Sequence, residues 1–204
     1  MKLLVVGAGA MGTLFSGMFA SGGHEVWLLG RRPEVVASVA RQGVTVIRGH
    51  SRFSVRVNAT MRAADVGRTD LVLLFVKAYD TSQACADALP AVGPDTTVLT
   101  LQNGLDNVET IASAVGRDRV LAGVTAHGAT LVGPGVVRHA GEGETAMGEL
   151  DGRETDRLRA VAVAFRQAGI EVELSSRVDS LIWGKLVVNA AINPVTALLG
   201  VANG

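Results

Sequence analysis

The first thirteen residues, MKLLVVGAGAMGT, constrain the fold most strongly. Residues 3–6 form an apolar run, which is typical of a strand covered on both faces. Gly7, Gly9 and Gly12 follow it, and this G-x-G-x-x-G spacing between a strand and a helix is typical of a dinucleotide site. A purely structural glycine turn is the alternative, but the position directly after the strand favours the nucleotide.

Each glycine has its own physical task in such a site. Gly7 permits a tight turn, Gly9 lacks a Cβ where a pyrophosphate approaches the backbone, and Gly12 lets the next helix pack against the strand. The free N–H groups at the start of that helix would face the phosphates. The predicted nucleotide contacts of this turn are Gly7, Ala8, Gly9, Ala10, Met11 and Gly12.

The overall composition excludes several classes of protein. The chain has 204 residues, with 19 Lys plus Arg and 19 Asp plus Glu, so its charge does not suggest a nucleic-acid or anionic-membrane partner. Its one cysteine, Cys85, excludes an internal disulfide framework, and we expect it to be a buried apolar residue. No signal peptide or membrane-spanning run of about 18 uncharged apolar residues is apparent. We therefore expect a soluble, cytoplasmic protein.

Alternating strand and helix patterns predict an α/β fold with a doubly wound sheet. We expect helices over 10–21, 33–41, 81–89, 108–115, 155–168 and 178–199, the last with a kink or break at Pro194. Expected strands are 3–6, 25–29, 44–47, 53–57, 70–77, 96–101, 120–126, 136–139, 144–148 and 170–174. Of these, 136–139 and 144–148 are expected to be short antiparallel strands that close the sheet.

The residues after the second strand indicate which nucleotide binds. An NAD site usually has an acidic residue here for the ribose hydroxyls, whereas this chain has Gly30, Arg31 and Arg32, with no acid before Glu34. A guanidinium can bind a 2′-phosphate, which a carboxylate would repel. The sequence thus predicts NADP(H), with Arg31 as the preferred contact because it comes first. The alternative is that both arginines are solvated loop charges.

Three polar residues stand at or just beyond expected strand ends, where ligands bind in open α/β sheets. Lys77 ends the expected buried strand 70–77 and could otherwise simply reach solvent. Asn103 precedes Gly104, so its role could be purely conformational. His127 is a candidate acid or base, although a structural hydrogen bond is the favoured interpretation because nothing nearby in the sequence orients it.

The last expected helix carries one polar stripe on an apolar background. Lys185, Asn189 and Asn193 are spaced i, i+4 and i+8, which places them on one face. A solvent-facing stripe is the alternative, but the remaining surface of the helix is so apolar that we favour a ligand-facing one.

Taken together, these motifs resemble those of the ketopantoate reductases (2-dehydropantoate 2-reductases), along the whole chain. The most specific match is Trp183-Gly184-Lys185-Leu186-x-x-Asn189 followed by Ile192-Asn193-Pro194-x-Thr196. The others are the Gly7–Gly12 turn, Arg31, Val76-Lys77-Ala78, Leu101-Gln102-Asn103-Gly104 and Thr125-x-His127-x-Ala129.

The resemblance implies NADPH-dependent reduction of 2-dehydropantoate to (R)-pantoate, a step toward pantothenate and coenzyme A. It implies that Lys185 is the general acid and that Arg31 binds the 2′-phosphate. The implied cofactor contacts also include Lys77, Asn103 and Ala129, and the implied substrate contacts are Asn103, Lys185, Asn189, Asn193 and Asn203. The alternatives are a reductase of another branched 2-oxo acid and a non-catalytic NADP-binding fragment. The expected partner is a small 2-oxo acid, and a homodimer is plausible.

The resemblance also implies a domain organisation. Residues 1–174 correspond to a Rossmann-like NADP-binding domain and residues 175–204 to the first helix of an all-helical C-terminal domain. Family members are longer, so the chain resembles a truncated member. A serine and a glutamate that other members supply from that domain are then absent, and the last helix is expected to expose an apolar face.

Overall fold

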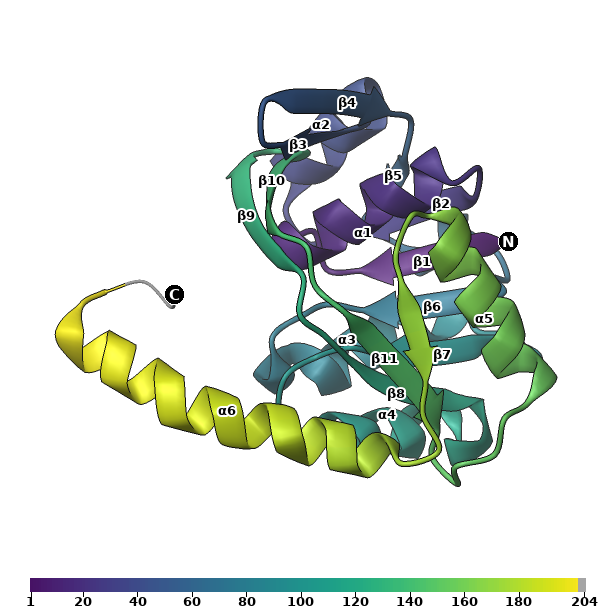
Figure 1. Ribbon diagram of the computed structural model, residues 1–204. Helices are drawn as coiled ribbons and strands as arrows, with labels where there is room; N and C mark the ends of the chain where they lie inside the picture. Colours follow the sequence, from purple (N-terminus) through teal and green to yellow (C-terminus); the bar gives the residue numbers. More distant parts are fainter. Residues whose placement is uncertain (202–204) are drawn as a thin grey trace.

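The computed structural model describes residues 1–201 and has an α/β architecture with two sheets (Figure 1). The main sheet contains β1 (Lys2–Val6), β2 (Glu25–Leu29), β5 (Asn58–Thr60), β6 (Leu71–Leu74), β7 (Thr97–Thr100), β8 (Val120–Thr125), β11 (Thr145–Glu149) and β12 (Val172–Leu174). The smaller sheet contains β3 (Val44–Arg48), β4 (Ser51–Val55), β9 (Gly128–Gly133) and β10 (Val136–Gly141).

The helices lie between and around these strands. They are α1 (Ala10–Ser21), α2 (Pro33–Gln42), α3 (Thr81–Ala88), α4 (Asn107–Val115), α5 (Asp156–Gln167) and α6 (Val178–Leu199). Four short 3-10 turns complete the described part of the chain, namely η1 (Ala63–Asp65), η2 (Ala78–Asp80), η3 (Leu89–Ala91) and η4 (Arg117–Arg119).

The described strands of the main sheet follow the order β12-β11-β8-β7-β6-β1-β2-β5. From β5 to β8 the neighbouring strands are parallel, and β11 pairs with β8 antiparallel. The chain leaves β1 toward β2 and β5 on one side, then crosses back to β6 on the other. This reversal puts a crevice between the carboxyl ends of β1 and β6, where doubly wound sheets bind ligands.

Alternate residues of the central strands fill two cores, one on each face of the sheet. Leu3 and Val5 pack with residues of α1 and α5, whereas Leu4 and Val6 pack with residues of α3 and α4. The side-chain period of two in a strand explains this division. Cys85 lies in the second core, so the expectation of a buried cysteine is confirmed. Burial raises the pKa of its thiol to about 11, which keeps it unreactive.

The smaller sheet corrects one sequence expectation. Residues 136–139 do not close the main sheet, because β10 pairs instead with β3 and β9. Of the two strands expected to close the main sheet, β11 joins it, antiparallel to β8. The short strands β5 and β9 were not expected from the sequence. Helix α1 packs against strands of both sheets. The smaller sheet therefore covers the part of α1 that does not contact the main sheet (Figure 1).

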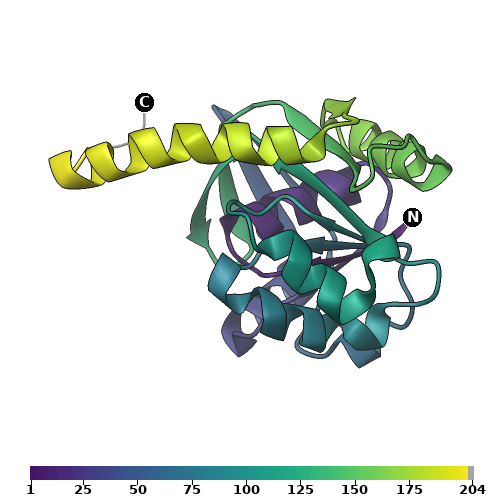
Figure 2. The ribbon, with the colours of Figure 1, turned by 90° about the horizontal axis from the view of Figure 1, so that it is seen from below.

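Helix α6 differs from the others because little of it is buried. Its first turns pack on β8 and β11, and the rest extends beyond the sheet (Figures 1 and 2). The expectation at Pro194 was a kink or a break, and the helix continues through this residue without a break. By length and composition alone it could span a membrane, with a mean hydropathy of 1.3, although one such helix is weak evidence. Its exposed apolar residues are Trp183, Val187, Val188, Ile192, Val195, Leu198 and Leu199.

Candidate functional site

The glycine turn has the geometry that its spacing predicts. Gly7 has a φ of +109°, and a Cβ there would lie 3.1 Å from the backbone nitrogen of Val76. A Cβ on Gly12 would lie 1.8 Å from the carbonyl oxygen of Gly7, so α1 can approach β1 only with glycine at this position. By contrast, no atom lies within 4 Å of a Cβ built on Gly9. Gly9 is the N-cap of α1 and leaves the N–H groups of the first turn without a side-chain cap.

Two cavities meet at this turn. The first, here called the nucleotide cavity, has a volume of about 250 Å³ and runs from the turn past Arg31 to α3. The second, the lysine cavity, has a volume of about 570 Å³ and runs from the turn to Lys185. Gly9, Phe75, Val76 and Lys77 line both cavities. The open space beside Gly9 and the uncapped N–H groups therefore suit a pyrophosphate between them, with a nucleoside on either side.

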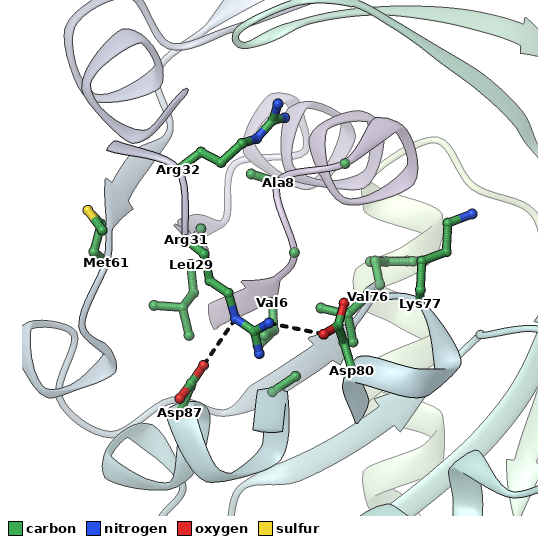
Figure 3. Close-up of a pocket in the computed structure, with 15 residues that line it drawn as sticks. Val6, Ala8, Leu29, Arg31, Arg32, Met61, Val76, Lys77, Asp80 and Asp87 are labelled. Atoms are coloured by element: carbon green, nitrogen blue, oxygen red, sulfur yellow. Dashed lines mark hydrogen bonds and ion pairs between the residues drawn. The ribbon is translucent and has the colours of Figure 1, made fainter. Parts of the chain in front are cut away.

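Arg31 lies in the nucleotide cavity between two carboxylates (Figure 3). Its Nη1 lies 3.1 Å from Asp80 Oδ1, and its Nε lies 3.5 Å from Asp87 Oδ2. Asp87 is itself oriented, because its Oδ1 accepts a hydrogen bond of 2.8 Å from Gln83. Arg32 lines the same cavity but points away from this cluster and makes no ion pair within the described residues (Figure 3). Sequence reasoning identified the arginines but not the acids that hold one of them.

Lys185 reaches the site from α6. Its Nζ donates a hydrogen bond of 2.5 Å to the carbonyl oxygen of Thr125, the last residue of β8. Burial lowers the pKa of the Lys185 ammonium below its ordinary value, because the charged form loses solvation. A lysine that is held by a neutral acceptor, has a lowered pKa and has no carboxylate partner within residues 1–201 is suited to giving up a proton.

The lysine cavity is electropositive. Lys77 and Lys185 line it together with Asn103, His127 and Ala129. No Asp or Glu occurs among its lining residues in the part of the chain that the structure describes. A small anion carrying a carboxylate would therefore meet two cations and no opposing charge there.

A hydrogen-bond network that sequence reasoning missed joins the strand ends around this cavity. The side-chain amide of Gln102 donates to the carbonyl oxygen of Val76 at 2.8 Å and to the hydroxyl of Thr81 at 3.0 Å. That hydroxyl donates to Asn107 Oδ1 at 3.0 Å, and the Asn107 amide donates to the carbonyl oxygen of Asn103 at 3.0 Å. The segments that carry Lys77 and Asn103 are thus tied together. The sequence motif around Gln102 does not reveal these hydrogen bonds, because the partners of Gln102 are more than 20 residues away in the chain.

His127 is paired with a second histidine. Its Nδ1 lies 2.9 Å from His139 Nε2, while its Nε2 is buried without a hydrogen-bond partner among the described residues. Burial, more than any charge, lowers the pKa of both imidazoles. The bond crosses from the end of β8 to β10, which agrees with the structural interpretation of His127. Within residues 1–201, no group of three His, Cys, Asp or Glu is placed to hold a metal ion.

The structure brings some of the predicted site residues together and leaves others apart. Lys77, Asn103, Ala129 and Lys185 line one cavity with the glycine turn. The two asparagines of the predicted stripe lie farther along α6 and do not line it: Asn189 is half-buried and Asn193 is exposed. Asn203 lies outside the described residues.

Comparison with known proteins agrees with this geometry. The family model described as "Ketopantoate reductase PanE/ApbA" matches residues 3–152. The chain is 41% identical to the 2-dehydropantoate 2-reductase of Halobacterium salinarum, over all of this chain and 67% of that protein. It is 37% identical to the enzyme of the same name from Pyrococcus abyssi, over all of this chain and 66% of that protein.

Solved structures give the same result. A 2-dehydropantoate 2-reductase from Geobacter metallireducens superposes with a TM-score of 0.91 at 33% identity, over 98% of this chain and 66% of that one. A D-mandelate dehydrogenase bound to NADH and anilino(oxo)acetate has a TM-score of 0.89 at 27% identity, over 98% of this chain and 65% of that one. The chain thus spans about two thirds of the length of the proteins it matches.

Proposed function

The chain belongs to the ketopantoate reductase PanE/ApbA family, and we propose that it reduces 2-dehydropantoate to (R)-pantoate with NADPH. One observation carries the proposal. Lys185, whose ammonium has a lowered pKa, lines a cavity that has no acidic side chain among the described residues, and this cavity meets the nucleotide cavity at the glycine turn. A cationic acid beside a dinucleotide site is what the reduction of an anionic ketone requires.

When bound, NADPH would supply the hydride that reaches the carbonyl carbon of the substrate. The ammonium of Lys185 donates a proton to the carbonyl oxygen, so that the C=O bond becomes CH–OH and the lysine is left neutral. Before transfer, the same ammonium stabilises the negative charge that develops on that oxygen. The carbonyl of Thr125 holds the lysine at the cavity wall and accepts one of its N–H bonds, so that the other N–H bonds of the ammonium would be available to the substrate.

The other residues orient the reactants. We assign Lys77, Asn103 and Ala129 to the nicotinamide and its ribose, and Asn103 also to the substrate, because all three line the lysine cavity. Asn189, Asn193 and Asn203 are proposed to bind the hydroxyl and carboxylate end of the substrate on the strength of the family motif. Correct orientation of a ketone against a hydride donor is worth several orders of magnitude in rate.

Arg31 is proposed to select NADPH through the 2′-phosphate. It lines the nucleotide cavity directly after β2, where a ribose hydroxyl is expected. If Arg31→Ala leaves the ratio of NADPH to NADH affinity unchanged, this assignment is wrong. The product would serve pantothenate biosynthesis in the cytoplasm, and a homodimer is proposed as the functional state.

A second candidate is the reduction of a different 2-oxo acid. It is favoured by the similarity to the D-mandelate dehydrogenase, whose structure contains anilino(oxo)acetate. That enzyme also binds NADH, so the choice of nucleotide and the choice of substrate need to be tested separately.

A steady-state assay tests both candidates. The full chain is mixed with NADPH and ketopantoate, and the loss of nicotinamide absorbance is followed. A panel of branched and aromatic 2-oxo acids is run in parallel. Turnover fastest with ketopantoate supports the proposal, and turnover fastest with another 2-oxo acid supports the second candidate. NADPH binding without turnover on any acid would instead indicate a non-catalytic nucleotide-binding protein.

A further inference from the structure

The nucleotide cavity contains two acidic side chains that a site for a phosphorylated nucleotide does not require. Asp80 and Asp87 line it together with Arg31, and both carboxylates face the Arg31 guanidinium (Figure 3). They come from η2 and α3, which follow β6, whereas Arg31 follows β2. The three charges therefore meet across the crevice between the two halves of the fold.

These acids compete with a phosphate for the same arginine. One N–H of Nη1 is occupied by Asp80, and Nε is paired electrostatically with Asp87. A 2′-phosphate that binds Arg31 must either displace a carboxylate or take up a position close to one, and like charges at such distances repel. A ribose 2′-hydroxyl meets no such repulsion and can donate a hydrogen bond to a carboxylate.

We propose that Asp80 and Asp87 are specificity-determining residues, which offset the charge of Arg31 and thereby weaken the preference for a 2′-phosphorylated nucleotide. The proposal rests on the dinucleotide site of the proposed function. It assigns the choice between a phosphorylated and an unphosphorylated nucleotide to a cluster of three charges. Arg32 lines the same cavity and makes no ion pair with the residues that the structure describes. The wild-type chain is accordingly expected to accept both forms.

Binding of half-nucleotides tests this without catalysis. The dissociation constants of 2′,5′-ADP and 5′-AMP, which differ by the 2′-phosphate, are measured by calorimetry for the wild type and for Asp80→Asn, Asp87→Asn and the double variant. We expect each single variant to bind 2′,5′-ADP about threefold to tenfold more tightly, since one like charge is removed beside the phosphate. Binding of 5′-AMP is expected to stay within about twofold, and the gain to shrink as salt is raised.

Two controls isolate the charge effect. Asp87→Glu keeps the charge and should show no gain. Asp95→Asn removes the same charge from the loop before β7. This loop lies at the amino end of the strand, away from the carboxyl ends that form the site, so the ratio of the two dissociation constants should stay unchanged. Adding Arg31→Ala to the double variant should abolish its gain, because the arginine is then no longer available to the phosphate.

The outcomes separate this inference from the proposed function. If both half-nucleotides bind and the Asp→Asn variants leave the ratio unchanged, the inference is wrong while the nucleotide site stands. If the variants weaken 2′,5′-ADP binding, the carboxylates position Arg31 for the phosphate, which also overturns the inference. If the wild type binds neither half-nucleotide, the proposed dinucleotide site itself fails.

Discussion

The Nζ of Lys185 lies 2.5 Å from the carbonyl oxygen of Thr125, although 60 residues separate the two in the chain. This bond fixes the lysine at the carboxyl end of β8, at the edge of the sheet where the glycine turn also lies. It is the contact through which α6 enters the site, because Lys185 is the α6 residue that lines the lysine cavity among those described.

Replacing Lys185 by alanine should remove the proton donor. We expect kcat/KM for ketopantoate to fall by about 10²- to 10⁴-fold, the range measured for a lost general acid, while the dissociation constant of NADPH stays unchanged. Val187→Ala, at an exposed position on the same helix, is the matched control and should retain full activity. An alanine variant with wild-type turnover would exclude Lys185 as the acid.

The pH dependence of activity should also report the ionisation of Lys185. The acid must be protonated to react, and the pKa of Lys185 is lowered by burial, so activity should decline on the basic side at a pH below the ordinary value of 10.5. Lys185→Arg keeps the charge but does not deprotonate at attainable pH. Its residual activity should therefore show no basic limb from this group. A basic limb that persists unchanged in the arginine variant would have to come from another group.

Alanine substitutions at Gly9 and Gly12 should have separate effects, the first on nucleotide binding and the second on folding stability. Gly9→Ala adds a Cβ that meets no atom within 4 Å, so the free energy of unfolding should change by less than about 0.5 kcal/mol. The methyl group would stand where the pyrophosphate approaches, and the loss of one charge-assisted bond to a backbone N–H should weaken NADPH about tenfold or more.

Gly12→Ala should instead lower the folding stability. Its Cβ would lie 1.8 Å from the carbonyl oxygen of Gly7, and such overpacking typically costs about 1–3 kcal/mol of folding free energy. Urea unfolding of both variants measures the predicted difference in stability, and nucleotide titration measures the predicted difference in affinity. Equal losses of stability in the two variants would contradict the geometry of the turn.

Gln102→Leu should destabilise the strand ends. The substitution leaves the Val76 carbonyl without its amide donor and removes a bond to the Thr81 hydroxyl. A fully buried acceptor left unpaired costs about 1–3 kcal/mol, so this part-buried carbonyl should cost about 1 kcal/mol, which urea unfolding would detect. Gln83→Leu, at an exposed position on α3, is the control and should cost less. A neutral Gln102→Leu would show that water replaces the amide there.

The His127–His139 pair should make the protein less stable in mild acid. The pKa of each imidazole is lowered in the folded state, so the unfolded chain takes up protons first as the pH falls below about 6.5. The free energy of unfolding then falls, by about 1.4 kcal/mol for each pKa unit between the two states. Nearby Glu142 opposes the shift in both histidines, whereas nearby Arg48 adds to it.

Substitution isolates this effect from other groups. His139→Gln removes one titrating group but retains an amide that can donate to His127, so the loss of stability in acid should be smaller than in the wild type. His24, whose pKa is also lowered, titrates in both proteins and cancels from the comparison. Equal acid sensitivity of the His139 variant and the wild type would show that the pair contributes nothing.

The sequence was sufficient wherever the information is local. The bounds of α1 and α6 agree with their apolar patterns, and the glycine turn has the backbone that its spacing predicts. Residues 136–139 show the limit. Their sequence correctly predicts a strand, but an isolated strand pattern does not encode which edge it joins, and β10 joins β3 in the smaller sheet.

What the sequence determined by itself is the α/β class, the dinucleotide turn at Gly7 to Gly12, and the family to which the motif around Lys185 belongs. Only the tertiary structure decided that Arg31 is held by Asp80 and Asp87, and that Lys185 reaches the cavity while Asn189 and Asn193 do not line it. The reason is physical. Spacing along the chain controls backbone geometry and the face on which a side chain lies, whereas an ion pair or a cavity depends on which distant segments the packed sheet brings within a few ångströms.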